Sequence, residues 1–429
     1  MTHAAPAFTP ATGRALLRDL FDAALRAVDP LFSVPRHLPP RPRGRTVVVG
    51  AGKAAARMAL ALEQAWDGPL SGLVVTHRGH GEPCRRIEVL EADHPVPDEA
   101  GVQAAHRILT QVQGLGPDDL VIALVSGGGS ALLAAPAEGL TLADKRRVTS
   151  ALLQSGATIA EMDCVRRHLS AVKGGKLAQA CGPAMVWTLV LSDVPGDDAR
   201  TVAAGPTLAD GSTPADALDV LARHGIALPP AVARALQAPP AAAYAGPVGE
   251  RHWRVIGTAQ GALEAAAALA AARGLRALIL GNAIDGEARH VGRVQAGIAR
   301  QVARHGQPAP APCLLLSGGA TTVTVTGPGR GGRNAEFLLG HLVGVCEPGA
   351  NAHRFWGLAA DTDGVDGSES NAGAVFGPDS WQRAQALGLS AQDMLARNDA
   401  FSFFEALGDL VVTGPTRTSV NDFRATLVA

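Results

Sequence analysis

The sequence predicts an α/β protein of two domains whose sheets are mostly parallel. Short β-branched runs alternate with Ala- and Leu-rich stretches of helical spacing from end to end, which is typical of such folds. The chain has 429 residues, more than a single hydrophobic core usually supports. A hydrophobic content of 47% and a charged content of 18% favour large buried cores and argue against general disorder.

The first part of the chain has five expected strands, separated mostly by helices. The strands are expected at 46–49, 73–76, 87–91, 120–125 and 185–191. The helices are expected at 53–64, 99–112, 142–154, 159–171 and 214–224, and Thr141 with Asp144 predicts an N-cap for the third of them. Residues 237–250 are rich in Pro and Ala and have no periodicity, which indicates a linker. We therefore expect domains at 1–240 and 251–429.

A second α/β unit is expected after this linker. Its strands are expected at 253–256, 276–280, 313–317, 321–326, 354–360 and 410–413, and its helices at 259–272, 287–305 and 334–345. Alternating Thr and Val residues at 322–325, after a Gly-Gly turn, predict one antiparallel hairpin. The second sheet is therefore expected to be mixed.

Charge and composition bear on several classes of partner. The formal net charge of −1 gives no support for a nucleic-acid or anionic-membrane partner, because both favour basic surfaces. No window of 18 apolar residues and no secretory signal is present, so a cytoplasmic protein without a membrane span is expected. Five scattered cysteines without a CxxC pair indicate reduced, buried thiols.

The first candidate site follows the strand at 46–49. Gly50 and Gly52 allow a tight turn before Lys53, at the start of a helix whose free N–H groups attract anions. The segment partly matches the dinucleotide fingerprint, but no acidic residue ends the next strand, and it is not a Walker A loop. It is either a structural turn or a phosphate or carboxylate site. Lys53 favours the site. Only four of the 38 basic residues are lysines, so a lysine at this position indicates that a compact ammonium is needed there.

The second candidate site is a glycine run after the strand at 120–125. Its members are Ser126, Gly127, Gly128, Gly129 and Ser130. Successive glycines let backbone amides approach an anion, and the hydroxyls add donors. Phosphate binding and a flexible turn are the two interpretations, and the apolar residues that follow favour the first. A shorter echo in the second half consists of Ser317, Gly318 and Gly319.

The third candidate site surrounds two arginines with four glycines, just before the helix at 334–345. Arg330 and Arg333 lie in this loop, and Asn334 follows. A guanidinium there suits bidentate binding of phosphate or carboxylate. An exposed loop with solvated arginines is the alternative.

Acidic residues follow two further strands. Asp361 and Asp363 come after the strand at 354–360, where one or two carboxylates could help to hold Mg²⁺ on a nucleotide or form a surface turn. Asp193 follows the strand at 185–191, at the position of a general base, a metal-orienting carboxylate or a capping residue. All of these signals fall at the carboxyl ends of expected strands, where open α/β sheets bind ligands.

Nine ordered motifs resemble the glycerate 2-kinases, whose C-terminal part is known as the MOFRL domain and whose members are sometimes labelled hydroxypyruvate reductases. The motifs are GAGKAAARMA (50–59), HPVPDEAG (94–101), SGGGSALL (126–133), LSAVKGGKLA (169–178), SDVPGDD (192–198), AAGPT (203–207), SGGATTV (317–323), GRGGRNAEF (329–337) and DTDGVDG (361–367). The resemblance runs from about Arg14 to Leu427.

This resemblance implies a larger Rossmann-like N-terminal domain, a smaller C-terminal α/β domain and an active site in the cleft between them. It implies Mg²⁺-assisted transfer of phosphate from ATP to the 2-hydroxyl of D-glycerate, giving 2-phosphoglycerate and ADP. Lys53 and Arg333 map onto residues that the family treats as essential, and we assign Asp193 as base or metal-orienting group. The expected partners are glycerate and ATP, with no nucleic acid or membrane, and a homodimer is left open.

Two alternative functions come from the residues themselves. The Gly50–Gly52 turn is compatible with an NAD(P)H-dependent hydroxypyruvate reductase, although the acidic residue that would bind ribose is missing. The Ser126–Ser130 run is compatible with a phosphosugar-binding module that catalyses nothing.

Overall fold

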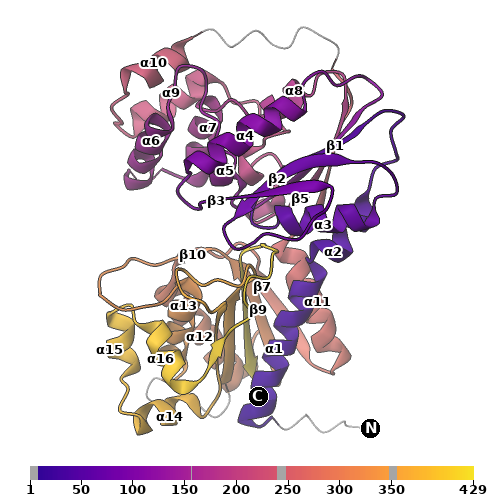
Figure 1. The fold of residues 1–429 in the computed structure, drawn as a ribbon. Helices are drawn as coiled ribbons and strands as arrows, with labels where there is room; N and C mark the ends of the chain where they lie inside the picture. Colours follow the sequence, from indigo (N-terminus) through magenta and orange to yellow (C-terminus); the bar gives the residue numbers. More distant parts are fainter. Residues whose placement is uncertain (1–7, 156, 239–247, 347–354) are drawn as a thin grey trace. The chain divides into compact units, whose positions relative to one another are not determined.

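The computed structural model describes residues 8–155, 157–238, 248–346 and 355–429, which form two compact units (Figure 1). The first unit is Pro30–Ile256, and the second unit combines Met1–Asp29 with Gly257–Ala429. The chain therefore passes from one unit to the other twice. The prediction placed residues 1–29 in the first domain and residues 251–256 in the second. In the structure, residues 1–29 belong to the second unit and residues 251–256 to the first.

The first unit is built on a six-stranded sheet in the order β3-β2-β1-β4-β5-β6. The strands are β1 (Thr46–Ala51), β2 (Ser71–His77), β3 (Ile87–Ala92), β4 (Leu120–Ser126), β5 (Met185–Leu191) and β6 (Arg251–Gly257). The pairs from β3 through to β5 are all parallel. Every residue of β1 and β4 is buried, as expected for continuous apolar strands covered on both faces. This is the strand order of the Rossmann fold.

Helices cover this sheet and form a separate cluster beside it. They are α2 (Pro30–Ser33), η1 (Val34–His37), α3 (Ala55–Ala65), α4 (Glu99–Gln111), α5 (Gly129–Leu132), α6 (Leu142–Gln154), α7 (Ile159–His168), α8 (Lys176–Ala180), η2 (Pro195–Asp197), η3 (Val202–Ala204), α9 (Pro214–Arg223) and α10 (Pro230–Gln237). Apolar residues of α4 and α8 pack on β1, β2 and β4, whereas α6, α7, α9 and α10 share a core of their own. The predicted cap of α6 is confirmed as a full capping box between Thr141 and Asp144.

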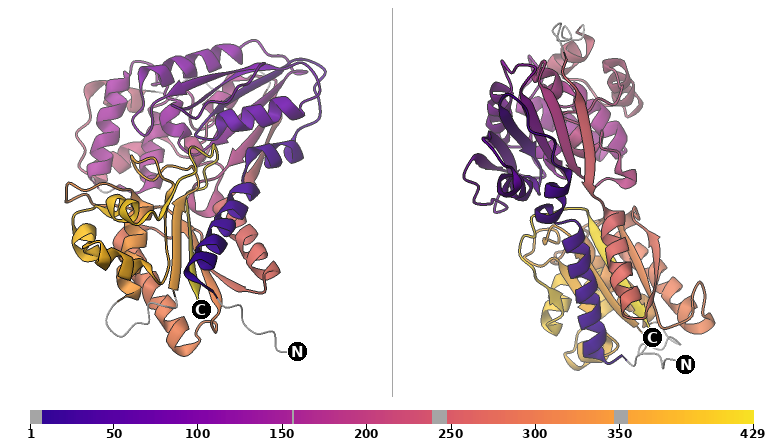
Figure 2. Two further views of the ribbon diagram at one scale, coloured as in Figure 1. Left: turned by 60° about the horizontal axis from the view of Figure 1, so that its bottom comes forward. Right: turned by 90° about the vertical axis from the view of Figure 1, so that its right-hand side faces the viewer.

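The second unit is built on a mixed sheet in the order β13-β12-β11-β14-β9-β7, as the two views in Figure 2 let the reader follow. The strands are β7 (Arg276–Gly281), β9 (Cys313–Gly319), β11 (Phe355–Asp361), β12 (Gly373–Phe376), β13 (Leu410–Val411) and β14 (Asp422–Val428). Only β7 and β9 are parallel, and β14 runs antiparallel to both of its neighbours. The mixed sheet was predicted, but the hairpin at 322–325 was wrong: β10 (Thr321–Thr322) pairs in parallel with β8 (Gly286–Glu287).

Helices cover both faces of the second sheet. They are α1 (Pro10–Ala27), α11 (Ala259–Ala272), α12 (Ala288–His305), α13 (Arg333–Val345), α14 (Ser380–Ala386), α15 (Ala391–Ala396) and α16 (Ala400–Leu407). Alternate residues of β14 point to opposite faces, so Phe423 meets Phe21 of α1 while Arg424 lies over the ring of Phe337 in α13.

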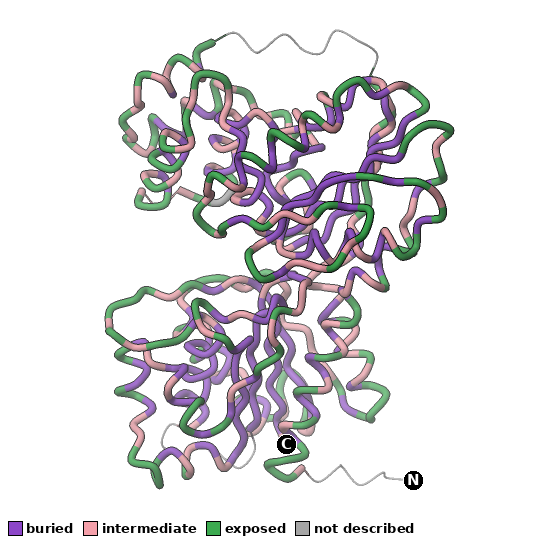
Figure 3. Tube along the Cα trace, viewed as in Figure 1, coloured by how far each residue is buried: buried purple, intermediate pink, exposed green. Residues whose placement is uncertain are grey.

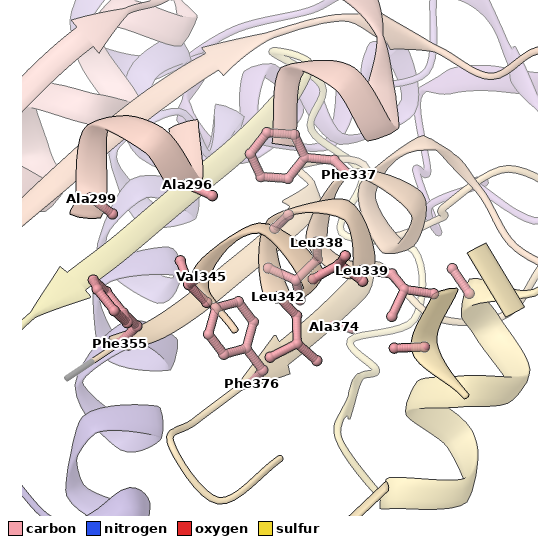
Figure 4. Close-up of a cluster of buried hydrophobic side chains, with 14 of the residues drawn as sticks. Ala296, Ala299, Phe337, Leu338, Leu339, Leu342, Val345, Phe355, Ala374 and Phe376 are labelled. Carbon is pink, nitrogen blue, oxygen red and sulfur yellow. The ribbon is translucent and has the colours of Figure 1, made fainter. Parts of the chain in front are cut away.

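The second unit has an apolar core around α13. Phe337, Leu338 and Leu342 pack there with Phe355 and Phe376 from the sheet (Figure 4). Buried residues follow the strands of each unit (Figure 3). Within the described parts of the chain, no helix combines the length and apolar character that crossing a bilayer requires. The α/β fold class, with one parallel and one mixed sheet, is confirmed.

Candidate active site

The carboxyl ends of β1 and β4 meet where the strand order of the first sheet reverses, and sheets of this type bind ligands outside that point. A Cβ atom at Gly50 would overlap the carbonyl oxygen of Leu124, and one at Gly52 would overlap Ser126 Oγ. Gly52 also has φ of +139°, a conformation that favours glycine. Glycine is therefore required for the two strand ends to come together.

Lys53 lies beside the predicted glycine-rich loop. Its backbone N–H donates to the Gly127 carbonyl at 2.9 Å, and a Cβ atom at Gly128 would lie 3.2 Å from Lys53 Cγ. Ser126 is completely buried, and its Oγ accepts a hydrogen bond from the Ala54 N–H at 3.1 Å. The structure thus brings Lys53 and the loop together, and the Ser126 hydroxyl holds the loop against the start of α3.

Asp193 joins this group because it follows β5, the neighbour of β4. A Cβ atom at Gly127 would overlap the Asp193 carboxylate, so only glycine allows this approach. Asp193 and Ser130 are both half-buried, whereas Gly129 is buried against Ala203. Lys53, the loop and a partly exposed carboxylate therefore lie at one edge of the sheet.

Histidines border the same group, and the sequence had not assigned them a role. A Cβ atom at Gly128 would lie 3.2 Å from the His94 imidazole, whose ring centroid is 5.8 Å from that of His77. Burial, followed by the positive charge of Lys53, lowers the pKa of His94 to about 3. The same two causes lower the pKa of His77. His94 is therefore uncharged at neutral pH, and Lys53 carries the positive charge of this edge.

In the second unit, Arg333 begins α13 and lies between two carboxylates. Its Nε donates to Asp422 Oδ1 and its Nη2 to Asp361 Oδ2, each at 2.8 Å. Register places Asp422, at the start of β14, opposite both Asp361 and Gly319. Burial acts to lower the pKa of Arg333, but the two carboxylates outweigh it and raise that pKa. The side chain stays 28% exposed, so a permanent positive charge is accessible here.

The N-terminus of α13 is capped from within the unit. The Asp366 carboxylate accepts hydrogen bonds from the N–H groups of Asn334 and Ala335 at 2.9 and 2.8 Å. The Asn334 amide also donates to Asp422 at 2.9 Å, so this predicted binding residue supports the carboxylate that holds Arg333. Burial raises the pKa of Asp366 to about 7, although the two N–H groups act to lower it.

The remaining predicted binding residues of this unit contact protein groups. Ser317 exchanges hydrogen bonds with the side chain of Gln295 at 2.9 and 3.2 Å and is buried. Gly318 and Gly319 are buried too. The exposed Arg330 pairs with Glu369 at 2.6 Å and lies over the ring of Phe401.

The two predicted metal ligands also have partners. Asp361 binds Arg333 with one oxygen and accepts the Asp363 N–H with the other, at 3.1 Å. Asp363 is buried and accepts the Val365 N–H at 2.9 Å. Across residues 8–429, apart from the three undescribed gaps, no three His, Cys, Asp or Glu side chains are grouped so as to hold a metal ion.

Sequence reasoning did not assign Asp422, Asp366 or His94 to the site. Asp366 and His94 lie within motifs that carried the family resemblance, so these motifs could have pointed to both residues as site candidates. Asp422 opens β14, which was not predicted as a strand. The alternation of Phe423, Ala425 and Leu427 with polar neighbours was the available signal.

The first sheet has the Rossmann strand order, with a lysine and a glycine-rich loop at its switch point. These features are typical of α/β proteins that bind small anionic ligands. Comparison with known proteins defines the family. Residues 16–237 match the domain of unknown function DUF4147, and residues 313–422 match the MOFRL family. The D-glycerate 2-kinase of Thermotoga maritima is 38% identical over 418 residues, which cover 97% of this chain and 98% of that protein.

Two further comparisons also extend over nearly the whole chain. An Agrobacterium vitis protein that carries the name hydroxypyruvate reductase is 53% identical over 424 residues, 97% of this chain and 95% of its own length. The solved structure of the Thermotoga maritima glycerate kinase matches with a TM-score of 0.85 at 37% identity, covering 98% of this chain and 100% of that one. The chain belongs to the glycerate kinase family with a C-terminal MOFRL domain.

Proposed function

We propose that this chain is a glycerate 2-kinase, which transfers the γ-phosphoryl group of ATP to the 2-hydroxyl of D-glycerate and releases 2-phosphoglycerate and ADP. The observation that carries this proposal is the position of Lys53 beside the glycine-rich loop, at the switch point of the first sheet. The name of the Thermotoga maritima relative supports the choice of reaction and substrate.

Charge neutralisation and alignment supply most of the catalysis in phosphoryl transfer. Lys53 offers an ammonium next to the backbone of Gly127 and Gly128, and we assign it to the negative charge of a phosphate or carboxylate. Arg333 offers a guanidinium whose positive charge is fixed by Asp361 and Asp422. We assign Arg333 to the charge that develops on the transferred phosphoryl group.

Asp193 is the proposed general base. Its half-buried carboxylate lies against Gly127, on the same edge as Lys53. It would accept the proton of the 2-hydroxyl as that oxygen forms a bond to the γ-phosphorus and the bond from phosphorus to the β–γ bridging oxygen breaks. ADP leaves with the electron pair of the broken bond.

The assignment of Mg²⁺ to Asp361 and Asp363 stays a prediction. Carboxylate oxygens suit the ion, and Mg²⁺ on a nucleotide needs only one or two of them. When bound, the ion would neutralise phosphate charge. Each Asp361 oxygen already accepts a hydrogen bond, one from Arg333 and one from the Asp363 N–H, so Mg²⁺ would share these oxygens with those donors.

The test is a product analysis of the purified protein with D-glycerate and ATP. Phosphorus NMR should show a new phosphomonoester at the 2-position and ADP in equal amount, and Lys53→Met should lose this turnover. A product phosphorylated at the 3-hydroxyl would overturn the position of transfer. ADP formation that does not depend on glycerate would overturn the substrate.

The reductase is the second candidate, because the first sheet has the Rossmann order and one relative carries that name. Against it, β2 ends at His77, followed by Arg78, without the acidic residue that binds a ribose hydroxyl. Oxidation of NADH or NADPH by hydroxypyruvate, followed at 340 nm, separates the two activities. The binding-module alternative is excluded if phosphate is transferred at all.

A further inference from the structure

A group of buried cations lies in the first unit and includes none of the residues assigned above. Three of the four lysines of the chain belong to it, namely Lys145, Lys173 and Lys176. Lys145 lies in α6, and Lys173 and Lys176 lie just before and at the start of α8. Lys145 is 8% exposed and Lys173 only 1%. Such burial is rare for lysine unless the ammonium is paired.

Two of these lysines are bound by backbone oxygens, and the third is not. Lys173 Nζ donates to the Leu133 carbonyl at 2.6 Å, and Lys176 Nζ donates to the Arg167 carbonyl at 2.9 Å. Lys145 Nζ is buried and has no hydrogen-bond partner among the described residues. A buried ammonium without a partner is costly, and binding of an anion would remove this cost.

The carboxylates nearby do not balance the charge. Asp163 lies 3.6 Å from Arg166, and Asp210 pairs with Arg167. Among the described residues, no salt bridge joins a carboxylate to any of the three lysines. Each of the two carboxylates is therefore already paired with an arginine of α7. Asp163 also attracts Lys173, which acts to raise the pKa of that lysine, but the cations of the group still outnumber the carboxylates.

The lysines and Arg166 are close enough to act on one another. Burial first, and then the positive charges of Lys176 and Arg166, lower the pKa of Lys145 to about 8. Burial and the charges of Lys145 and Arg166 lower the pKa of Lys173. Repulsion of this kind between buried cations is relieved when an anion binds among them.

This group is connected to the glycine-rich loop through α5. Leu133, the acceptor of Lys173, directly follows α5, and α5 starts at Gly129 of the loop. The helices that carry Lys145 and Arg166, α6 and α7, pack against each other (Figure 1). Lys173 thus links this group to the residue that follows α5.

We propose that Lys145, Lys173 and Arg166 form a second anion site, which binds a phosphate group. A dianionic phosphate suits a site with several cations better than a single carboxylate does. The phosphate can be free or part of a nucleotide. This site does not depend on the proposed kinase reaction, because its test measures binding without turnover.

The test compares the thermal unfolding of the full chain in sodium phosphate and in sodium chloride of equal ionic strength. The wild type should show a saturable rise in Tm with phosphate, because a ligand that binds only the folded state stabilises it. Lys53→Met should keep this rise, since it removes the lysine of the other site. Adding Lys145→Met to Lys53→Met, so that phosphate binding at the other site does not mask the effect, should reduce the apparent affinity for phosphate at least about tenfold, the loss expected for one charged hydrogen bond.

Further ligands identify the source of the phosphate. These ligands are compared in Lys53→Met with and without Lys145→Met, because ADP and D-glycerate are also the proposed ligands of the other site. A rise that ADP but not free phosphate produces, and that Lys145→Met removes, assigns the site to a nucleotide phosphate and supports the proposal. A rise that only D-glycerate produces, and that Lys145→Met removes, overturns the choice of phosphate. An equal rise with and without Lys145→Met, or no rise with any ligand, overturns the site.

A second measurement uses the wild type alone, in case Lys145→Met does not fold. The rate of acetylation of Lys145 is followed by mass spectrometry, with and without phosphate at constant ionic strength. Bound phosphate should slow this acetylation at least severalfold while leaving that of the protein amino terminus unchanged. Equal rates at Lys145 with and without phosphate contradict the proposal.

Discussion

Arg333 is held by two carboxylates that contact different nitrogens of its guanidinium. Arg333→Lys keeps a positive charge between Asp361 and Asp422, but a lysine ammonium cannot present the same planar set of donors. We expect a Tm close to that of the wild type. Turnover of D-glycerate and ATP should fall about 10³-fold, the lower end of the range for an arginine that stabilises a phosphoryl transition state. A coupled assay of ADP release measures this loss.

The matched control is Arg397→Lys, an exposed arginine of the same unit that lies 3.8 Å from Asp399. Its turnover should stay within about twofold of the wild type, because exposed ion pairs contribute little. Turnover of Arg333→Lys as fast as that of this control would remove Arg333 from the proposed reaction.

At the scale of the element, α13 begins with a buried acid at its cap. Asp366 has a folded-state pKa of about 7, above its ordinary value, so the folded protein holds this proton more tightly than the unfolded chain. The contribution of this raised pKa to the free energy of unfolding is fully present below pH 3.8, and it is lost as the pH rises through 7. Between pH 5 and pH 7 the expected loss in free energy of unfolding is about 2 kcal/mol, from about 1.4 kcal/mol per pKa unit.

The variant Asp366→Asn tests this assignment, because it keeps an oxygen acceptor and cannot ionise. Urea unfolding at a series of pH values should show that the decline between pH 5 and pH 7 is smaller in the variant by about that amount. Asp285→Asn, at an exposed Asp of the same unit, should leave the decline unchanged. Parallel curves for wild type and Asp366→Asn would show that Asp366 does not titrate in this range.

Elements were predictable where local chemistry alone decides them. The strand before Gly50 and the capping box of Thr141 are such cases, since a buried apolar run and a reciprocal cap are written in adjacent residues. The sequence placed Ser126 and Asp361 at the carboxyl ends of strands, and they end β4 and β11. Arg333, in contrast, begins α13, and Asp422 begins a strand that was not predicted. What Ser126 and Ser317 bind was not predictable, because Ala54 and Gln295 reach them only through the tertiary fold.

At the scale of the whole molecule, the pairing of distant segments is what the sequence left open. The strand at residues 253–256 was predicted, but it pairs next to β5 in the first sheet and not in the second. The first helix has a clear apolar face with Leu17, Leu20 and Phe21 buried. Periodicity identifies such a face but not the surface that it covers, and here that surface belongs to residues 257–429.

Helix α1 should therefore stabilise a unit whose other residues begin more than 200 positions later. Phe21 is 1% exposed, and its ring centroid is 5.6 Å from that of Phe423 in β14. Arg14 adds a salt bridge to Asp379 at 2.8 Å. Phe21→Ala should lower the free energy of unfolding by about 3–5 kcal/mol, the usual cost of removing a buried phenylalanine ring.

The matched control is Phe32→Ala, a phenylalanine only eleven positions away that is 54% exposed and lies in the first unit. Its cost should stay within about 0.5 kcal/mol. Hydrogen exchange locates the effect: Phe21→Ala should speed exchange of amides in β11 and β14, on which α1 packs, more than exchange of amides in β1 and β4. Faster exchange confined to β1 and β4 would mean that α1 stabilises the first unit, as the predicted domain boundary required.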